Sequence, residues 1–202
     1  MWSSVEIRAA YDRVRREVGP GVTVVVATKY VTVEEMARLV EAGIEVAGEN
    51  RAQDLAAKHA RYADAFRWHF IGHLQSRKAP LVSELCELVH SLDSVSAASR
   101  LRAPALVQVN LSSEGSKSGV PPAELARFLA EARELGVDVR GLTTMPPLSA
   151  EPERSRPYFR ELATLAGEHG LSELSMGTSQ DYRVAAEEGA TFVRVGALLF
   201  GR

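Results

Sequence analysis

A repeated order of short apolar runs and amphipathic stretches restricts the fold of this sequence more than any other feature. Eight apolar runs of strand length occur, at residues 22–29, 44–50, 68–72, 87–93, 105–110, 139–145, 171–177 and 191–201. Helical patterns separate them, at 32–43, 51–63, 76–86, 94–101, 121–136, 153–170 and 181–190, and another helical pattern covers residues 4–18. Alternating strands and helices indicate parallel pairing through right-handed crossovers. Near-continuous Val and Leu runs are typical of strands buried on both faces.

Eight such units predict a (β/α)8 barrel of the TIM type, in which the N-terminal helix fills the place of a missing eighth helix. A doubly wound open sheet is the alternative, because the alternation separates the two folds poorly. No G-x-G-x-x-G motif follows the first strand, which weakens a dinucleotide-binding interpretation. Several helix ends are marked: Thr32 with Glu35 forms a capping-box pattern, Pro121 and Pro122 open a helix, and Gly136 closes it.

Composition excludes several classes of protein. The length is enough for one domain, residues 1–202, with a full core. A net charge of −2 argues against a general binder of nucleic acid or of anionic membranes, although a local phosphate site remains open. The charged N-terminal stretch has no signal-peptide core, and no run reaches the roughly 20 apolar residues of a membrane span. We therefore expect a cytoplasmic protein that does not bind membranes.

Cysteine and histidine usage bears on redox and metal chemistry. The single cysteine, Cys86, can form no intrachain disulfide and no Cys-based metal cluster, and we expect it to be a packing residue. The five histidines show no close pair at helical ligand spacing, so no metal site is predicted.

Polar residues gather where the predicted strands end. These ends carry Lys29, the run Gly48-Glu49-Asn50, His69 with Gly72-His73, Asn110, the run SMGTSQD (175–181), and Arg194 with Gly196. In a barrel of this type the site lies at the carboxyl ends of the strands. The pattern therefore predicts a small-molecule site.

Two basic residues at these ends each allow two interpretations. We expect Lys29 to be partly buried. Either its stem packs while the amine reaches water, or desolvation lowers its pKa and makes it a Schiff-base lysine. Arg194 lies in a strand that should be fully buried, so it either forms a structural salt bridge or contacts an anion or ring nitrogen. Gly196 would let a phosphate approach the backbone closely.

Two further residues are ambiguous in the same way. Ser179, in the run before the predicted helix at 181–190, either helps to cradle an anion or is a plain helix N-cap. His69 is either a satisfied core residue or a contact to a bound ring, since we expect it in one layer with Lys29, Asn50 and Arg194.

Longer motifs carry a specific resemblance. They are VVVATKY (24–30), AGENRAQD (47–54), WHFIGHLQSRK (68–78), HSLDS (90–94), VQVNLSSEGSKSG (107–119), GLTTMPP (141–147) and LSMGTSQDYRVAAEEGATFVRVGALLFG (174–201). They cover nearly the whole chain in order. With them the chain resembles the pyridoxal phosphate homeostasis protein family, which is related to the N-terminal domain of alanine racemase.

The resemblance implies a (β/α)8 barrel that binds pyridoxal 5′-phosphate (PLP). Carried over by position, it makes Lys29 the Schiff-base lysine and places Arg194 at the pyridine nitrogen. It assigns the phosphate to Ser179 and the backbone N–H groups of Gly196 and Ala197. It also implies that Asn50 and His69 lie beside the ring. Two departures are visible. The segment between strands four and five leaves room for only a very short helix, and Thr143 stands where the family more often has methionine, with little consequence expected.

The resemblance to racemases raises the question of catalysis. A PLP racemase needs an acid–base group on each face of the cofactor, and Lys29 would supply only one. We therefore expect storage and delivery of PLP without strong catalysis. A PLP-dependent racemase or lyase of low activity is the alternative, and a barrel enzyme acting on a phosphorylated metabolite without PLP is a third interpretation.

The expected partners are PLP and apo PLP-dependent enzymes, with no nucleic acid, and the expected state is a monomer. In the loop 112–119, Glu114 and Lys117 form either a solvated surface pair or a gate for PLP release.

Overall fold

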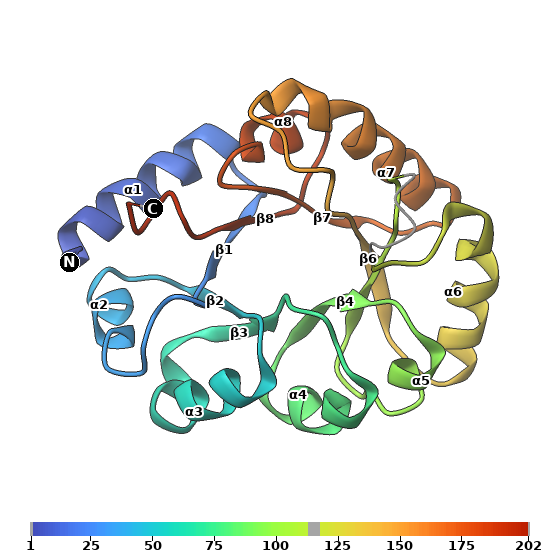
Figure 1. Ribbon diagram of the computed structural model, residues 1–202, viewed down its shortest axis with the longest axis horizontal. Coiled ribbons are helices and arrows are strands. Elements are labelled where there is room, and N and C mark those ends of the chain that lie inside the picture. Colours follow the sequence, from blue (N-terminus) through green and yellow to red (C-terminus); the bar gives the residue numbers. More distant parts are fainter. Residues whose placement is uncertain (1, 113–117, 202) are drawn as a thin grey trace.

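The computed structural model describes residues 2–112 and 118–201, and in these ranges eight parallel strands form a closed barrel in chain order (Figure 1). The strands are β1 (Thr23–Ala27), β2 (Val46–Glu49), β3 (Arg67–Phe70), β4 (Leu88–Leu92), β5 (Ala105–Gln108), β6 (Val139–Thr143), β7 (Glu173–Thr178) and β8 (Phe192–Val195). The ring closes because β1 pairs with β8, from Thr23 opposite Phe192 to Val26 opposite Val195. The predicted barrel is thus confirmed, and the open-sheet alternative is excluded.

Helices surround the barrel and cover its strands (Figure 1). The α-helices are α1 (Ser4–Val18), α2 (Met36–Glu41), α3 (Ala52–Tyr62), α4 (Ala79–Leu85), α5 (Val95–Ala98), α6 (Leu125–Glu134), α7 (Arg156–Glu168) and α8 (Tyr182–Glu187), and the short 3-10 helices are η1 (Ala63–Ala65), η2 (Ser76–Lys78), η3 (Pro122–Glu124) and η4 (Pro152–Ser155). As predicted, α1 lies between α8 and α2 in the ring, where an eighth crossover helix would otherwise lie. The very short helix expected between strands four and five is α5. None of the helices in the described ranges is long and apolar enough to cross a membrane.

The helix-end signals of the sequence operate as expected. The backbone N–H of Thr32 donates to Glu35 Oε2 (3.0 Å) and that of Glu35 donates to Thr32 Oγ1 (3.3 Å), which are the two bonds of a capping box. Gly136 follows α6 with a φ of 82°, a conformation that favours glycine.

One strand prediction was wrong in its second half. The apolar run 191–201 was expected to be a strand throughout, but β8 ends at Val195 and the chain then turns, with Leu199 N–H donating to the Gly196 carbonyl (2.9 Å). After the turn, Phe200 packs on the N-terminal segment instead, since its ring lies 4.7 Å from that of Trp2. Apolar character alone does not separate a strand from a buried turn.

Side chains alternate between two packed regions, one between strands and helices and one inside the barrel. On β3, Trp68 and Phe70 are buried in the outer region, whereas His69 faces the barrel interior. The interior side also carries Phe192, whose ring lies 5.7 Å from that of His69. The polarity of the WHFIG run therefore belongs largely to the inside of the barrel. The loop residues Glu114 and Lys117 lie outside the described residues.

Candidate functional site

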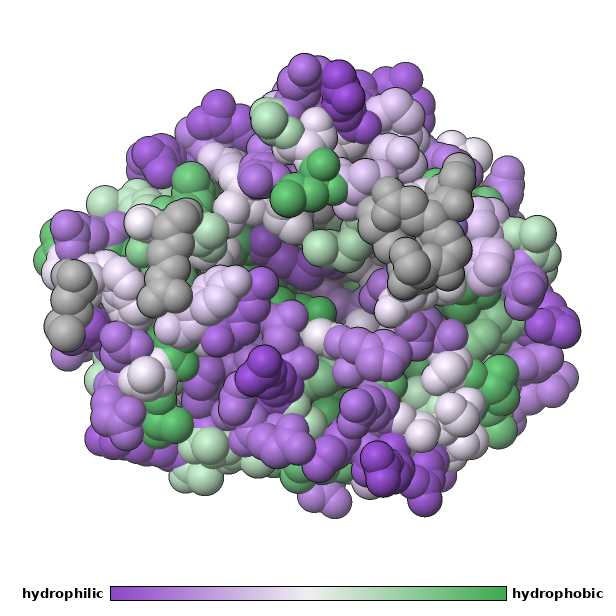
Figure 2. Space-filling model, viewed as in Figure 1, coloured by the Kyte–Doolittle hydropathy of each residue, from purple (hydrophilic) through white to green (hydrophobic). Residues whose placement is uncertain are grey.

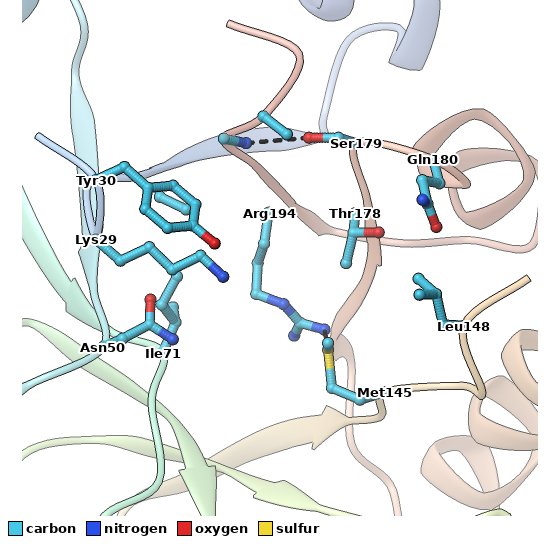
Figure 3. A pocket seen from close by; sticks show the side chains of 13 residues that line it. Lys29, Tyr30, Asn50, Ile71, Met145, Leu148, Thr178, Ser179, Gln180 and Arg194 are labelled. Carbon is cyan, nitrogen blue, oxygen red and sulfur yellow. Dashed lines mark hydrogen bonds between the residues drawn. The ribbon is translucent and has the colours of Figure 1, made fainter. Parts of the chain in front are cut away.

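A cavity of about 320 Å³ lies at the carboxyl ends of the strands, where β1, β2, β7 and β8 meet (Figure 3). It is lined by Ala27, Lys29, Tyr30, Asn50, Ile71, Met145, Leu148, Thr178, Ser179, Gln180, Arg194, Gly196 and Ala197. The centre of this face is hollowed in the space-filling view (Figure 2). Six of the seven residues predicted to hold a cofactor lie together here, and His69 does not.

The rim of the cavity is apolar and open. Tyr30 is 46% exposed, Met145 50% and Leu148 87%, and all three line the cavity. Sequence reasoning did not predict any of them, and Tyr30 could have been found because it directly follows Lys29. Large apolar side chains left in water beside a cavity are typical of a ligand-binding mouth.

Lys29 points into the cavity from the end of β1 (Figure 3). Its ammonium nitrogen lies 4.9 Å from the centroid of the Tyr30 ring, a cation–π distance. The side chain is exposed, which corrects the expectation that it would be partly buried. The reason is position: Thr28 ends the continuous buried run 24–28, and Lys29 lies one residue beyond it, at the cavity mouth.

A buried ion pair behind Lys29 fixes the ends of β1 and β2. Lys58, on α3, donates to Glu49 Oε2 and to the Thr28 carbonyl oxygen (2.8 Å). Glu49 also accepts from the Thr28 hydroxyl (2.8 Å) and the Asn50 backbone N–H (2.7 Å). Sequence reasoning missed this set, although Lys58 stands out as a lysine on the apolar face of α3, three residues after Leu55. One carboxylate thus holds the backbone next to Lys29 and next to Asn50.

Ser179 lies across the cavity from Lys29, in the segment between β7 and α8 (Figure 3). Its hydroxyl accepts from the backbone N–H groups of Gly196 (3.2 Å) and Leu198 (3.3 Å). It does not cap α8, whose N-cap residue is Asp181. Backbone N–H groups and a hydroxyl therefore converge at this end of the cavity, and such groups bind anions.

The backbone is close-packed here. A Cβ atom at Gly196 would lie 3.1 Å from the Cβ of Ala27 and 3.3 Å from its carbonyl oxygen. At Gly72, just beyond β3, a Cβ atom would lie 1.9 Å from the Asn50 carbonyl oxygen. Glycine at these two positions lets the neighbouring strand ends approach each other under the cavity.

Arg194 forms the floor of the cavity, and its terminal nitrogens are held by the protein. Nη1 donates to Thr143 Oγ1 (2.6 Å), Ser175 Oγ (2.6 Å) and the Ser175 carbonyl (3.0 Å), and Nη2 donates to the Thr144 carbonyl and Met145 Sδ (both 2.9 Å). The four terminal hydrogens are thus committed. Among the guanidinium N–H groups, only Nε–H has no partner in the part of the chain that the structure describes. In Figure 3 this part of the side chain borders the cavity.

The charge of Arg194 is balanced by dipoles, not by a partner ion. No carboxylate forms a salt bridge with it among the described residues, so the structural salt bridge considered above is absent there. Burial lowers the pKa of Arg194 to about 10, although Asp181 acts in the opposite direction. Thr143 was expected to have little consequence, but its hydroxyl is a direct partner of this guanidinium.

His69 lies below the cavity, inside the barrel, and is only 1% exposed. Its Nδ1 is 2.9 Å from Nε2 of His90, a residue that sequence reasoning did not select. Ile71, two residues later on the same face, takes the place at the cavity wall. Burial, with the charge of Arg67 second, lowers the pKa of His69 to about 3, so the ring is neutral.

Other reactive groups lie apart from the cavity. In residues 2–112 and 118–201 no three His, Cys, Asp or Glu side chains are grouped so that they could hold a metal ion. Cys86 is buried, and burial raises the pKa of its thiol to about 12. This thiol is not a nucleophile at neutral pH.

Comparisons with known proteins show the family of this chain. A family model described as the alanine racemase N-terminal domain matches residues 3–202. The pyridoxal phosphate homeostasis protein of Aquifex aeolicus is 40% identical over 192 residues, which cover 87% of this chain and 84% of that protein. The protein of the same name from Pseudomonas aeruginosa is 39% identical over 173 residues, covering 79% of this chain and 75% of that protein.

Solved structures give the same answer for the fold. PipY of Synechococcus elongatus, solved with PLP bound, has a TM-score of 0.88 and 33% identity, covering 96% of this chain and all (100%) of that chain. The arginine decarboxylase of Paramecium bursaria Chlorella virus has a TM-score of 0.79 at 13% identity, covering 98% of this chain and 63% of that one, and shares the fold alone. This chain belongs to the pyridoxal phosphate homeostasis protein family, within the wider family of the alanine racemase N-terminal domain.

Proposed function

We propose that this protein binds PLP through a Schiff base to Lys29 and holds it for delivery within the cell, without strong catalysis of its own. The observation that carries the proposal is the arrangement of reactive and hydrogen-bonding groups around the cavity. An exposed amine at the end of β1 faces, across a cavity of about 320 Å³, a hydroxyl and backbone N–H groups at the ends of β7 and β8 (Figure 3). A flat ligand with an aldehyde at one side and a phosphate at another matches this arrangement. The binding of PLP by PipY, a relative, supports it.

The phosphate end of the proposal rests on Ser179 and the turn after β8. The hydroxyl of Ser179 would turn from the N–H groups of Gly196 and Leu198 towards the phosphate, and those N–H groups would then donate to the same anion. The close approach of the backbone at Gly196 keeps side-chain bulk away from this position. Ala197 lines the same wall and adds a third backbone N–H.

The ring end rests on Arg194. Its Nε–H is the donor left for a ligand, and a pyridine nitrogen is an acceptor that suits it. When bound, PLP supplies an aldehyde that condenses with amines and a ring that can withdraw electrons. An arginine does not readily give up its proton, so a ring nitrogen facing Arg194 stays unprotonated and withdraws electrons weakly. Asn50, at the end of β2, would flank the ring.

Weak catalysis is proposed because the described residues that line the cavity include no second acid–base group in the right place. Tyr30 is the tyrosine that lines the cavity, but it follows Lys29 and lies on the same edge (Figure 3). A racemase needs its two groups on opposite faces of the reacting carbon. Low racemase or lyase activity remains the alternative function, and turnover of amino acids by the PLP-loaded protein would decide for it.

The deciding experiment is borohydride reduction of the PLP-loaded protein followed by peptide mass spectrometry. A reduced PLP adduct on Lys29 is expected. The Lys29→Ala variant should lose the adduct and the visible absorption band, whereas Lys78→Ala, which changes a lysine outside the cavity, should keep both. An adduct at full yield on another lysine in the Lys29→Ala protein would overturn the assignment.

A further inference from the structure

A chain of hydrogen bonds runs from the cavity floor into the interior of the barrel. Nη1 of Arg194 donates to Ser175 Oγ (2.6 Å), Ser175 Oγ lies 2.7 Å from Nδ1 of His90, and Nε2 of His90 lies 2.9 Å from Nδ1 of His69. All four residues are buried. They come from β8, β7, β4 and β3, so the chain spans the width of the barrel.

The direction of these hydrogen bonds follows from the donors available. A guanidinium only donates, so the Ser175 oxygen accepts from Arg194 and the hydroxyl hydrogen is free to point to His90. Nδ1 of His90 is then an acceptor, its hydrogen lies on Nε2, and Nδ1 of His69 accepts in turn. Burial lowers the pKa of both histidines, so each ring is neutral and carries one hydrogen.

The opposite direction leaves more groups unsatisfied. If each histidine carried its hydrogen on Nδ1, the Ser175 hydroxyl hydrogen would have no acceptor among the described residues, and Nε2 of His69 would have no donor. In the direction derived above, only one group lacks a partner, the Nε2–H of His69, and Nε2 is indeed a buried atom without one. Unsatisfied buried polar groups are costly, so the direction with fewer of them is favoured.

We propose that His90 and His69 are positioning residues that, through Ser175, hold the guanidinium of Arg194 so that its Nε–H faces the cavity. The inference rests on the proposed PLP site for its functional consequence but not for its geometry. While Nδ1 of His90 accepts the hydroxyl hydrogen of Ser175, the hydroxyl keeps one orientation, and its oxygen accepts from Arg194 in that orientation. Loss of His90 frees the hydroxyl to rotate and removes that constraint from Nη1.

The geometric part is tested on the protein without PLP. Long-range ¹H–¹⁵N correlation spectra distinguish the two neutral tautomers of histidine from the imidazolium, and His69→Phe and His90→Phe variants assign the signals. The Nε2–H tautomer is expected for both residues at neutral pH. Nδ1–H tautomers, or a charged ring in either residue, would overturn the proposal. This result stands whether or not PLP binds.

The functional part uses PLP affinity and a double-mutant cycle. His90→Phe and Ser175→Ala should each raise the Kd for PLP about three- to tenfold, the scale of one lost hydrogen bond. The double variant should be no weaker than either single variant, because both break the same chain. His90→Asn, whose Oδ1 takes the place of Nδ1 as acceptor, should restore most of the affinity.

A matched control separates positioning from general loss of packing. His59→Phe changes a histidine whose ring lies 6.0 Å from Trp68 on the outer side of β3, and its Kd should equal that of the wild type. Additive losses in the double variant, or an equal loss in His90→Asn and His90→Phe, would show that the effect is merely structural. If wild-type protein fails to bind PLP, the proposed function fails and the tautomer result decides the positioning proposal alone.

Discussion

The ammonium nitrogen of Lys58 lies 2.8 Å from the carbonyl oxygen of Thr28, the residue directly before Lys29. This bond joins α3 to the end of β1 from outside the barrel, while the lysine proposed to bind PLP points into the cavity. The same ammonium pairs with Glu49, at the end of β2. The position of Lys29 therefore depends on an ion pair that is not part of the cavity lining.

Removing one member of this pair should destabilise the protein strongly. Both side chains are almost fully buried, so Lys58→Met leaves an uncompensated carboxylate, which costs about 3–5 kcal/mol. Urea denaturation measures the loss. The Glu49→Leu/Lys58→Met double variant should lose less than the sum of the single variants. Arg140→Ala, which breaks an exposed pair with Asp138, should change the stability little, and an equal effect at the two sites would contradict the buried role.

Charge reversal at the cavity floor should weaken PLP binding far more than loss of one hydroxyl. Arg194→Glu places an unpaired anion near the ring and the phosphate, a cost of several kcal/mol. Ser179→Ala removes one donor, a cost of about 1–2 kcal/mol. Fluorescence titration with PLP measures both, after circular dichroism has verified the fold. Equal affinities of the wild type and both variants would refute the site.

Thr143→Val tests a hydroxyl partner of Arg194. Valine keeps the volume but removes the hydroxyl that accepts from Nη1 at 2.6 Å and donates to the Ser175 carbonyl at 2.7 Å. The Kd for PLP should rise about two- to tenfold. An unchanged Kd would mean that the remaining acceptors hold Arg194 without help from Thr143.

Acid should unfold the protein in part through His69. Its pKa is lowered to about 3 in the folded state, below the ordinary value of 6.5, so between these values the unfolded chain binds a proton that the folded protein does not. Stability should fall as the pH drops from 6.5 towards 3, by up to about 1.4 kcal/mol per pH unit for this group. His69→Leu should reduce the slope of stability against pH.

The control for this slope is a histidine that has no ion-pair partner among the described residues. His169→Leu, at the C-cap of α7, shows how much of the change comes from losing any histidine. A slope in His69→Leu that equals that of the wild type would contradict the buried neutral state of His69.

Cys86 should resist thiol reagents in the folded protein. Burial raises the pKa of this thiol to about 12, so the reactive thiolate is scarce at neutral pH and the sulfur is also shielded. Reaction with an aromatic disulfide reagent should be slow in buffer and complete in denaturant. Rapid reaction in buffer would contradict the packing role.

The sequence predicted the barrel and most of the cavity because both depend on local order along the chain. Strand ends can be counted from apolar runs, so Lys29, Asn50 and Ser179 were placed at one end of the barrel. His69 was expected at the level of the cavity but lies deeper in the barrel. Inward-facing residues of a strand alternate with outward-facing ones, so successive inward-facing residues are about 6.6 Å apart along the strand. Ile71 therefore reaches the cavity and His69 lies a layer below.

The supporting contacts could not be predicted because they depend on registers between elements far apart in the sequence. Glu49 and Lys58 are nine residues apart, but their joint contact with Thr28 depends on the pairing of β1 with β2 and on the angle of α3. The link from Ser175 to His90 crosses 85 residues. Nothing in either segment marks the other as its partner.

The pairing of the first strand with the last has a consequence for synthesis on the ribosome. Lys29 is synthesised well before Ser179 and Arg194, and the two groups become neighbours only when Val25 and Arg194 come into register. A nascent chain that lacks β8 has the amine but neither the anion cradle nor the guanidinium. Capture of the cofactor at the proposed site therefore has to follow the synthesis of β8, and a loaded molecule is one whose barrel has already closed.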